Sequence, residues 1–230
     1  MQHSLKLQYP LIAQLDELLL REYPITVRSI NQFADKLELG TGLLLLKSIY
    51  NHYSSVKLLL DGQFVESAGA VLTSIWEKSI MLQYLALDLG PRIKTYSTHQ
   101  TSKKLPWTVK TMVEGIARSE KIPEGKKVQD NIDLLYMQYS FLCAIKHGNP
   151  YTLTRINRVS TNEDFFKPNP TLEPEEQDVL GYLWLMSITT FFDGLTAYSK
   201  VLCSKSQYLN LDDISKLITN KYIVIPFINK

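Results

Sequence analysis

The sequence has few of the residues from which proteins build metal sites. Its 230 residues include only two cysteines and four histidines, and no close pair of cysteines provides the spacing of a zinc site. No histidine follows a glutamate by three residues, so the ligand pair of di-iron helical bundles is missing. We therefore expect no metal ion and no cofactor.

Glycine-rich phosphate loops are missing as well. The ten glycines do not occur in the Walker or dinucleotide-binding patterns. The sequence also has no Gly-x-Ser-x-Gly nucleophile elbow. Nucleotide hydrolases, dinucleotide-dependent enzymes and α/β-hydrolases therefore lose support together.

Charge and hydrophobicity give little sign of a nucleic acid or a membrane as a partner. The formal net charge is +2, and the basic doublets at 103–104 and 126–127 do not extend into a tract, as nonspecific nucleic-acid binding would favour. No stretch is continuously apolar over the ~20 residues of a membrane span, and the N-terminal segment lacks the pattern of a signal peptide. The expectation is a cytoplasmic protein without membrane contact, in which Cys143 and Cys203 are free thiols.

Helical periodicity dominates what is present. Apolar residues recur at helical spacing and no stretch alternates as a strand does, which predicts an all-α multi-helix bundle. The long helices are expected near 63–89, 128–147 and 175–203. Pro24 is expected to end the first helix, and Gly40-Thr41-Gly42 to interrupt a later one.

The same pattern suggests three parts of the chain. Residues 1–39 are expected to form N-terminal helices that pack on the bundle, and residues 40–205 the main helical domain. Residues 206–230 are expected to form a short helix and an apolar tail. The segment 148–174, which contains four prolines, is predicted to be a long loop.

Three ionisable residues stand within otherwise apolar helical stretches, namely Glu77, His147 and Asp193. Buried carboxylates and imidazoles need partners, so one economical arrangement places Glu77 against His147 with Asp193 nearby. A carboxylate beside an imidazole raises the pKa of the histidine and fixes its tautomer, as general acid–base chemistry requires. The alternative is that Glu77 pairs with Lys78 or solvent, and that Asp193 is solvated or interrupts its helix together with Gly194. His147 then simply ends a helix, because Gly148 and Pro150 are typical stop residues.

The stretch Tyr139–Pro150 resembles a family signature. It reads Tyr-Ser-Phe-Leu-Cys-Ala-Ile-Lys-His-Gly-Asn-Pro and is similar to the Tyr-x-x-Leu-Ser-x-x-x-His-Gly-x-Pro signature of an uncharacterised bacterial all-helical family. Cys143 takes the place of the family serine. That family has an arginine and a glutamate on an earlier helix, where this chain has Glu77 and a hydroxyl residue. The resemblance covers roughly residues 40–200 and implies that His147 and Glu77 are site residues.

These proteins look like distant relatives of HEPN domains, which are helical bundles often found as ribonucleases in toxin–antitoxin and phage-defence systems. The HEPN motif is an arginine followed after four to six residues by a histidine, usually used across a dimer. No arginine stands at that distance before His147, whereas Arg92 and His99 have six residues between them and share a helix face. Such residues help to activate the 2′-hydroxyl and to stabilise charge on the phosphate. Arg92 and His99 equally fit a solvated helix face.

The resemblance therefore implies that residues 40–205 form a HEPN-like domain, and that the chain is a metal-independent endoribonuclease of a defence or toxin system. It would act on RNA as a homodimer, with an antitoxin or another protein as a partner. The alternative is a noncatalytic dimerisation or partner-binding module with a degenerate active site. A third hypothesis is a small-molecule pocket, although aromatic residues at helical spacing more often form core. The aromatic residues concerned are Trp76, Tyr84, Tyr136, Tyr139 and Trp184.

Overall fold

The described parts of the chain consist of helices joined by turns and short irregular segments. The computed structural model describes residues 5–33, 36–99, 105–119, 128–148 and 174–202, and these ranges contain no strand, which confirms the all-α class. The helices are α1 (Leu5–Gln8), α2 (Pro10–Phe33), α3 (Lys36–Asp61), α4 (Val65–Ala86), α5 (Leu89–Thr98), α6 (Val109–Ser119), α7 (Val128–Lys146) and α9 (Pro174–Leu202).

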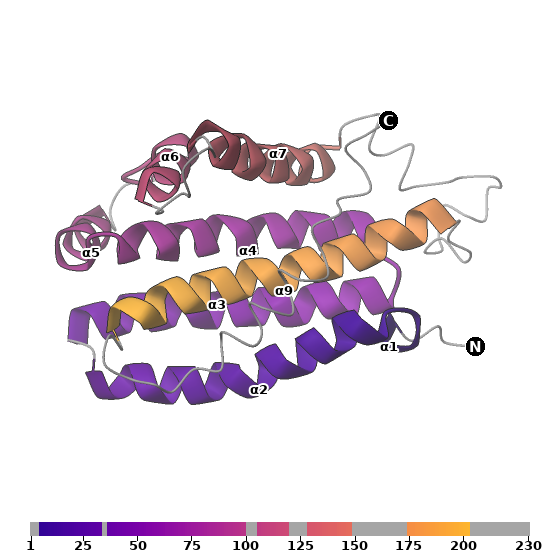
Figure 1. Cartoon of the computed structure of the whole chain (residues 1–230), viewed down its shortest axis with the longest axis horizontal. Helices are drawn as coiled ribbons and strands as arrows, with labels where there is room; N and C mark the ends of the chain where they lie inside the picture. Colours follow the sequence, from indigo (N-terminus) through magenta and orange to yellow (C-terminus); the bar gives the residue numbers. More distant parts are fainter. Residues whose placement is uncertain (1–4, 34–35, 100–104, 120–127, 149–173, 203–230) are drawn as a thin grey trace.

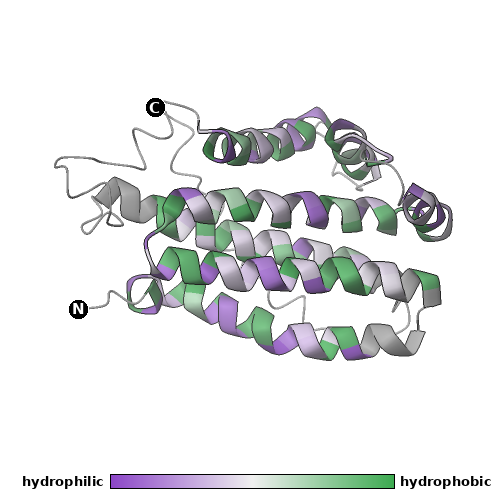
Figure 2. Cartoon of the chain, turned by 180° about the vertical axis from the view of Figure 1, so that it is seen from behind, coloured by the Kyte–Doolittle hydropathy of each residue, from purple (hydrophilic) through white to green (hydrophobic). Residues whose placement is uncertain are grey.

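Helix α4 lies at the centre of the bundle. It packs most extensively against α9 and α3, and also contacts α7 and α6. Figure 1 shows α2, α3, α9 and α4 running along the long axis of the molecule, with α6 and α7 beyond α4 and α5 at one end. In Figure 2, which views the chain from behind, α3 lies on the near side. The pair α6–α7 is therefore separated from α2 and α3 by α4.

The central position of α4 follows from its composition. Its residues Ser79–Leu82 are all buried, and so are Tyr84 and Leu85. A helix that is apolar nearly all round must be covered on every side to remain in water. Trp76, which is 1% exposed, anchors its middle.

Helix α9 supplies the facing half of this core. Its segment Val179–Ser199 is long and apolar enough to cross a membrane, but 67% of the apolar window is buried within the bundle. The central helix of a water-soluble bundle has the same composition, because it too is covered on all sides. Ser79 donates a hydrogen bond of 2.6 Å to the carbonyl of Thr190, which joins α4 to α9.

The three long helices predicted from the sequence are confirmed as α4, α7 and α9, each within a few residues of its expected ends. The division expected between residues 39 and 40 falls inside α3. Residues 149–173 of the loop predicted at 148–174 lie outside the described residues, as do the predicted C-terminal helix and tail and Cys203.

Two expected helix breaks were wrong. Pro24 stands inside α2 on the exposed side, where water can serve the carbonyl that proline leaves without an N–H donor. Gly40 and Gly42 stand inside α3. A Cβ on Gly42 would meet the ring of Tyr198, so this glycine provides room for an aromatic side chain of α9. The missing side chain of Gly42 is needed for this packing, and α3 continues through Gly42 without a break.

Candidate functional site

The predicted site lies where α7 packs antiparallel against α4. A Cβ on Gly69 would come within 2.7 Å of the side chain of Ile145, so the backbones approach closely there. Farther along, the indole N–H of Trp76 donates to the side-chain oxygen of Gln138 at 3.3 Å. Residue numbers therefore rise along α4 as they fall along α7.

Glu77 takes Tyr139 as its partner in this interface. The Tyr139 hydroxyl donates to the Glu77 carboxylate across 3.4 Å, and the Tyr139 ring stacks on Trp76 at 4.9 Å between centroids. Burial, the nearby Cys143 thiol and the charge of Glu77 raise the pKa of Tyr139 well above its usual range. At neutral pH this phenol is therefore protonated and acts as a hydrogen-bond donor.

His147 lies at a different level of the interface. It is exposed just beyond the end of α7, and its backbone N–H donates to the carbonyl of Cys143 at 2.9 Å. His147 stands eight positions after Tyr139, which corresponds to about 12 Å along a helix. Among the described residues no hydrogen bond or ion pair joins the His147 imidazole to Glu77. The structure thus brings Glu77 to Tyr139 instead of to His147.

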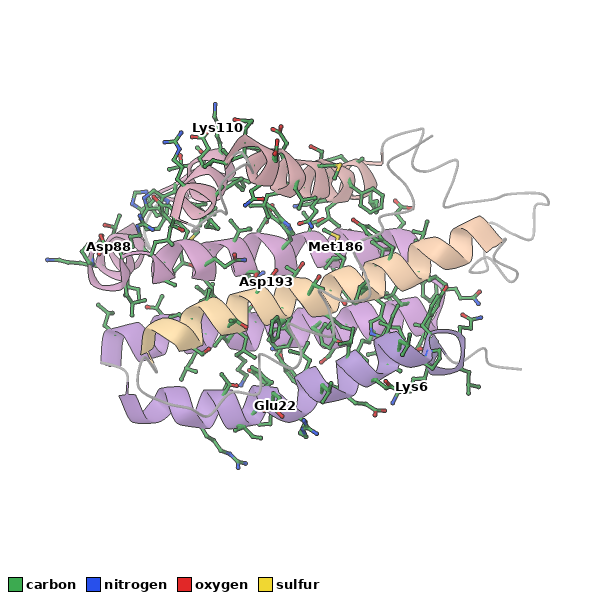
Figure 3. All side chains as sticks on the ribbon, viewed as in Figure 1. Lys6, Glu22, Asp88, Lys110, Met186 and Asp193 are labelled. Carbon is green, nitrogen blue, oxygen red and sulfur yellow. The ribbon has the colours of Figure 1, made fainter. Side chains whose placement is uncertain are left out.

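Asp193 belongs to the opposite side of α4. It is exposed on α9, as labelled in Figure 3, and the adjacent Gly194 packs against Ser79. Ser79 and Glu77 are about 200° apart around the axis of α4. Asp193 is therefore not placed with Glu77.

Lys78, the alternative partner of Glu77 in the sequence analysis, influences the charge balance beside this carboxylate. Burial lowers the pKa of Lys78, the neighbouring charge of Lys146 lowers it further, and Glu77 opposes both effects. The Lys78 ammonium also lies 3.5 Å from the carbonyl of Ser74 on its own helix. The Glu77 carboxylate thus lies beside the Tyr139 phenol and next to the half-buried Lys78, while Lys146, whose charge acts on Lys78, is exposed.

The Arg92 side chain contacts Tyr84 of α4. Its guanidinium donates to the carbonyl of Tyr84 near the C-terminal end of α4 and lies 3.9 Å from the centre of the Tyr84 ring. His99 caps the end of α5 and is exposed. Seven residues along a helix are about 10.5 Å, so Arg92 and His99 share a face at a distance of two turns.

The aromatic residues named from the sequence mostly form core. Trp76 and Trp184 are 1% and 2% exposed and Tyr84 is 8% exposed, which leaves them no open pocket to line. Tyr136 differs, since it lines a cleft between α6 and α7.

A second polar cluster, which sequence reasoning missed, lies in the core between α2 and α3. Tyr53 donates to Asp16, and the Lys57 ammonium lies 2.6 Å from the second Asp16 oxygen. Burial, followed by the charge and hydrogen bond of Asp16, raises the pKa of Tyr53, and the Trp184 indole opposes the rise. That indole N–H lies near the Tyr53 oxygen without a geometrically good hydrogen bond in the described part of the chain. The signal in the sequence that could have indicated this cluster is the i, i+4 spacing of Tyr53 and Lys57, which places both side chains on one face of a helix.

These contacts define an all-helical bundle whose polar groups are mostly paired within and between helices. No group of three or more histidine, cysteine, aspartate or glutamate residues in the described ranges could hold a metal ion. The chain matches no family model, no curated protein and no solved structure.

Proposed function

We propose that the chain is a noncatalytic, HEPN-like helical module with a degenerate active site that pairs with a second copy of itself. The observation that carries the proposal is the separation of the candidate catalytic groups. Glu77 binds Tyr139, Arg92 binds a backbone carbonyl, and His147 lies about 12 Å along α7 from the level of Glu77. Acid–base catalysis requires such groups within hydrogen-bond reach of one substrate.

The outer face of α3 supports pairing. Leu37, Leu44, Asn51 and Leu58 recur at intervals of seven residues along α3, and the leucines are 49%, 72% and 74% exposed. Leucines at seven-residue spacing occupy one of the two seam positions of a heptad repeat, along a stripe that winds slowly around the helix. Such a stripe can pack against another helix that carries the same repeat.

A second copy is the partner that this spacing favours. A stripe that repeats every seven residues is complementary to itself about a two-fold axis. A single asparagine within such a stripe can face its counterpart in the other copy and fix the register. Among the described side chains, the other exposed positions between the leucines are Gly40, Lys47 and Ser55, which add one charge to be accommodated.

The expected dimer is weak. The stripe from Leu37 to Leu58 is about 32 Å long, and a band of helix width along it falls short of the ~800 Å² per partner of a standard interface. We therefore expect association that depends on concentration.

Sedimentation velocity over a concentration series tests the pairing. The Leu44→Lys/Leu58→Lys double variant should remain monomeric where the wild type dimerises, with an unchanged melting temperature because both leucines are exposed. Leu7→Lys is the matched control, since Leu7 is 84% exposed but lies on α1. A wild type that stays monomeric throughout, or a double variant that dimerises equally well, would refute the proposal.

Ribonuclease activity is the second candidate. It is supported by the family resemblance and by the exposure of both His147 and His99, which a second copy or a protein partner such as an antitoxin could complete. Purified protein should then cleave RNA without metal, and His147→Ala or His99→Ala should abolish cleavage while the circular dichroism spectrum is preserved. If varied RNAs stay intact, with the wild type alone and with its partner, the catalytic hypothesis fails and the noncatalytic one stands.

A further inference from the structure

The hairpin of α6 and α7 contains a cleft of about 520 Å³. Pockets of this size accommodate small molecules. The cleft is on the other side of α4 from the α3 stripe, and Figure 3 shows Lys110 projecting from α6 at this outer edge. It is lined by Lys110, Glu114, Arg118, Gln129, Ile132, Asp133 and Tyr136.

Tyr136 brings an unsatisfied hydroxyl to this cleft. Its oxygen is buried and has no hydrogen-bond partner within the described residues. Buried hydroxyls are usually paired, because leaving one unpaired costs free energy. A ligand group in the cleft would supply the missing partner.

Glu114 forms ion pairs with both basic residues of the cleft. Lys110 and Arg118 approach its carboxylate at 3.8 Å and 3.5 Å, and both cations are more than two-thirds exposed. Such exposed pairs contribute little stability, so a ligand can displace them at low cost. On the facing helix, Asp133 accepts a hydrogen bond of 2.7 Å from Gln129.

The charges of the lining side chains balance. Lys110 and Arg118 provide two positive charges, and Glu114 and Asp133 provide two negative ones. A simple anion would therefore meet two carboxylates, and a simple cation would meet two basic groups. A molecule that carries one charge of each sign matches the lining better than either.

We infer that the α6–α7 cleft binds a small zwitterion of the amino-acid or short-peptide class. Its ammonium group would be held by Glu114 and the Tyr136 hydroxyl, and its carboxylate by Arg118 and Lys110. Ile132, which is 8% exposed, offers an apolar contact for the side chain. This site goes beyond the proposed pairing function and does not depend on it.

Calorimetric titration of the full chain with L-leucine tests the inference. The two matched half-molecules are 3-methylbutylamine, which lacks the carboxylate, and 4-methylpentanoate, which lacks the amine. A hydrogen bond to a charged group is worth roughly a factor of ten or more in affinity, so each half-molecule should bind at least about tenfold more weakly than leucine. Glycyl-leucine extends the series to a dipeptide.

Tyr136→Phe separates binding from folding. The change removes only a hydroxyl that has no hydrogen-bond partner among the described residues. The melting temperature should therefore stay the same or rise slightly, whereas leucine affinity should fall about tenfold. Glu114→Gln should weaken binding of the amine. Tyr96→Phe, on α5 and away from the cleft, should bind as the wild type does.

Two outcomes would overturn the inference. One is that neither leucine nor glycyl-leucine binds at millimolar concentration. The other is that they bind with the same affinity to Tyr136→Phe and Glu114→Gln, or no better than their half-molecules do. The pairing proposal is unaffected by either result, because its variants and readout concern α3.

Discussion

Replacing Asp16 by alanine tests how much the polar cluster between α2 and α3 contributes to stability. Asp16 is fully buried and serves two partners, the Tyr53 hydroxyl and the Lys57 ammonium at 2.6 Å. The Lys57 side chain is 24% exposed, so water solvates its charge only in part. The substitution leaves a buried hydroxyl and a largely buried cation without their acceptor.

The expected loss of unfolding free energy follows from these two orphaned groups. An unsatisfied buried hydroxyl costs about 1–3 kcal/mol, and breaking a buried ion pair from one side costs about 3–5 kcal/mol. Partial solvation of Lys57 reduces the second figure, and the two overlap because they share one carboxylate. We expect Asp16→Ala to lower the unfolding free energy by about 3–4 kcal/mol.

Equilibrium urea unfolding followed by circular dichroism measures this loss. Glu17→Ala is the matched control one residue away, since Glu17 pairs with Lys6 at 3.5 Å with both side chains more than half exposed, and it should change stability by at most about 0.5 kcal/mol. Adding Tyr53→Phe to Asp16→Ala should recover part of the loss, because the orphaned hydroxyl is then gone. An Asp16→Ala effect below about 1 kcal/mol, or one equal to that of Glu17→Ala, would refute the reasoning.

Three further predictions concern packing and pH. Gly42→Ala should lower the unfolding free energy by about 1–3 kcal/mol, because the added methyl group would meet the buried ring of Tyr198. Gly40→Ala has no described atom within 4 Å of its Cβ and should raise the unfolding free energy by up to about 1 kcal/mol. Urea unfolding measures both changes. Because the pKa of Tyr53 is raised in the folded chain, Tyr53 stays protonated above pH 10, where the unfolded chain releases the proton. Its contribution to the unfolding free energy is therefore complete below pH 10. Above pH 10 it declines by up to about 1.4 kcal/mol per pH unit. A urea series from about pH 9 to 11 should show a shallower decline for Tyr53→Phe. Arg92→Ala should lower the melting temperature by several degrees, corresponding to about 1–2 kcal/mol, as its contacts with α4 are lost.

Periodicity identified the helices because each long helix must bury an apolar face. The ends of α4, α7 and α9 were predictable within a few residues, since turn residues and prolines flank them. Pro24 and Gly42 misled the prediction for a tertiary reason. The disruption by Pro24 is tolerated at an exposed position, and the space left by Gly42 is filled by Tyr198 from α9, a contact between residues more than 150 positions apart.

The candidate site was less predictable because it depends on the register between two helices. Glu77 and His147 were each correctly placed within or beside apolar helices, but periodicity cannot determine how far α7 slides along α4. Because α5 and α6 lie between α4 and α7 in the chain, the connection does not determine this offset, and packing between the two helices does. Close contact of Gly69 with Ile145 fixes it, since a larger residue at 69 would push the helices apart.

That register decides which group can meet His147. The level of α4 opposite the end of α7 lies near Ala68, which is buried and apolar, while Glu77 is about 13 Å farther along the axis of α4. Bringing an imidazole to Glu77 would require it at the level of Tyr139, two helical turns before its actual position. Tyr139 already satisfies the carboxylate there and is itself held by stacking on Trp76. A catalytic pair of Glu77 and His147 would therefore need α7 to slide by more than two turns, which the Gly69 and Trp76 contacts oppose.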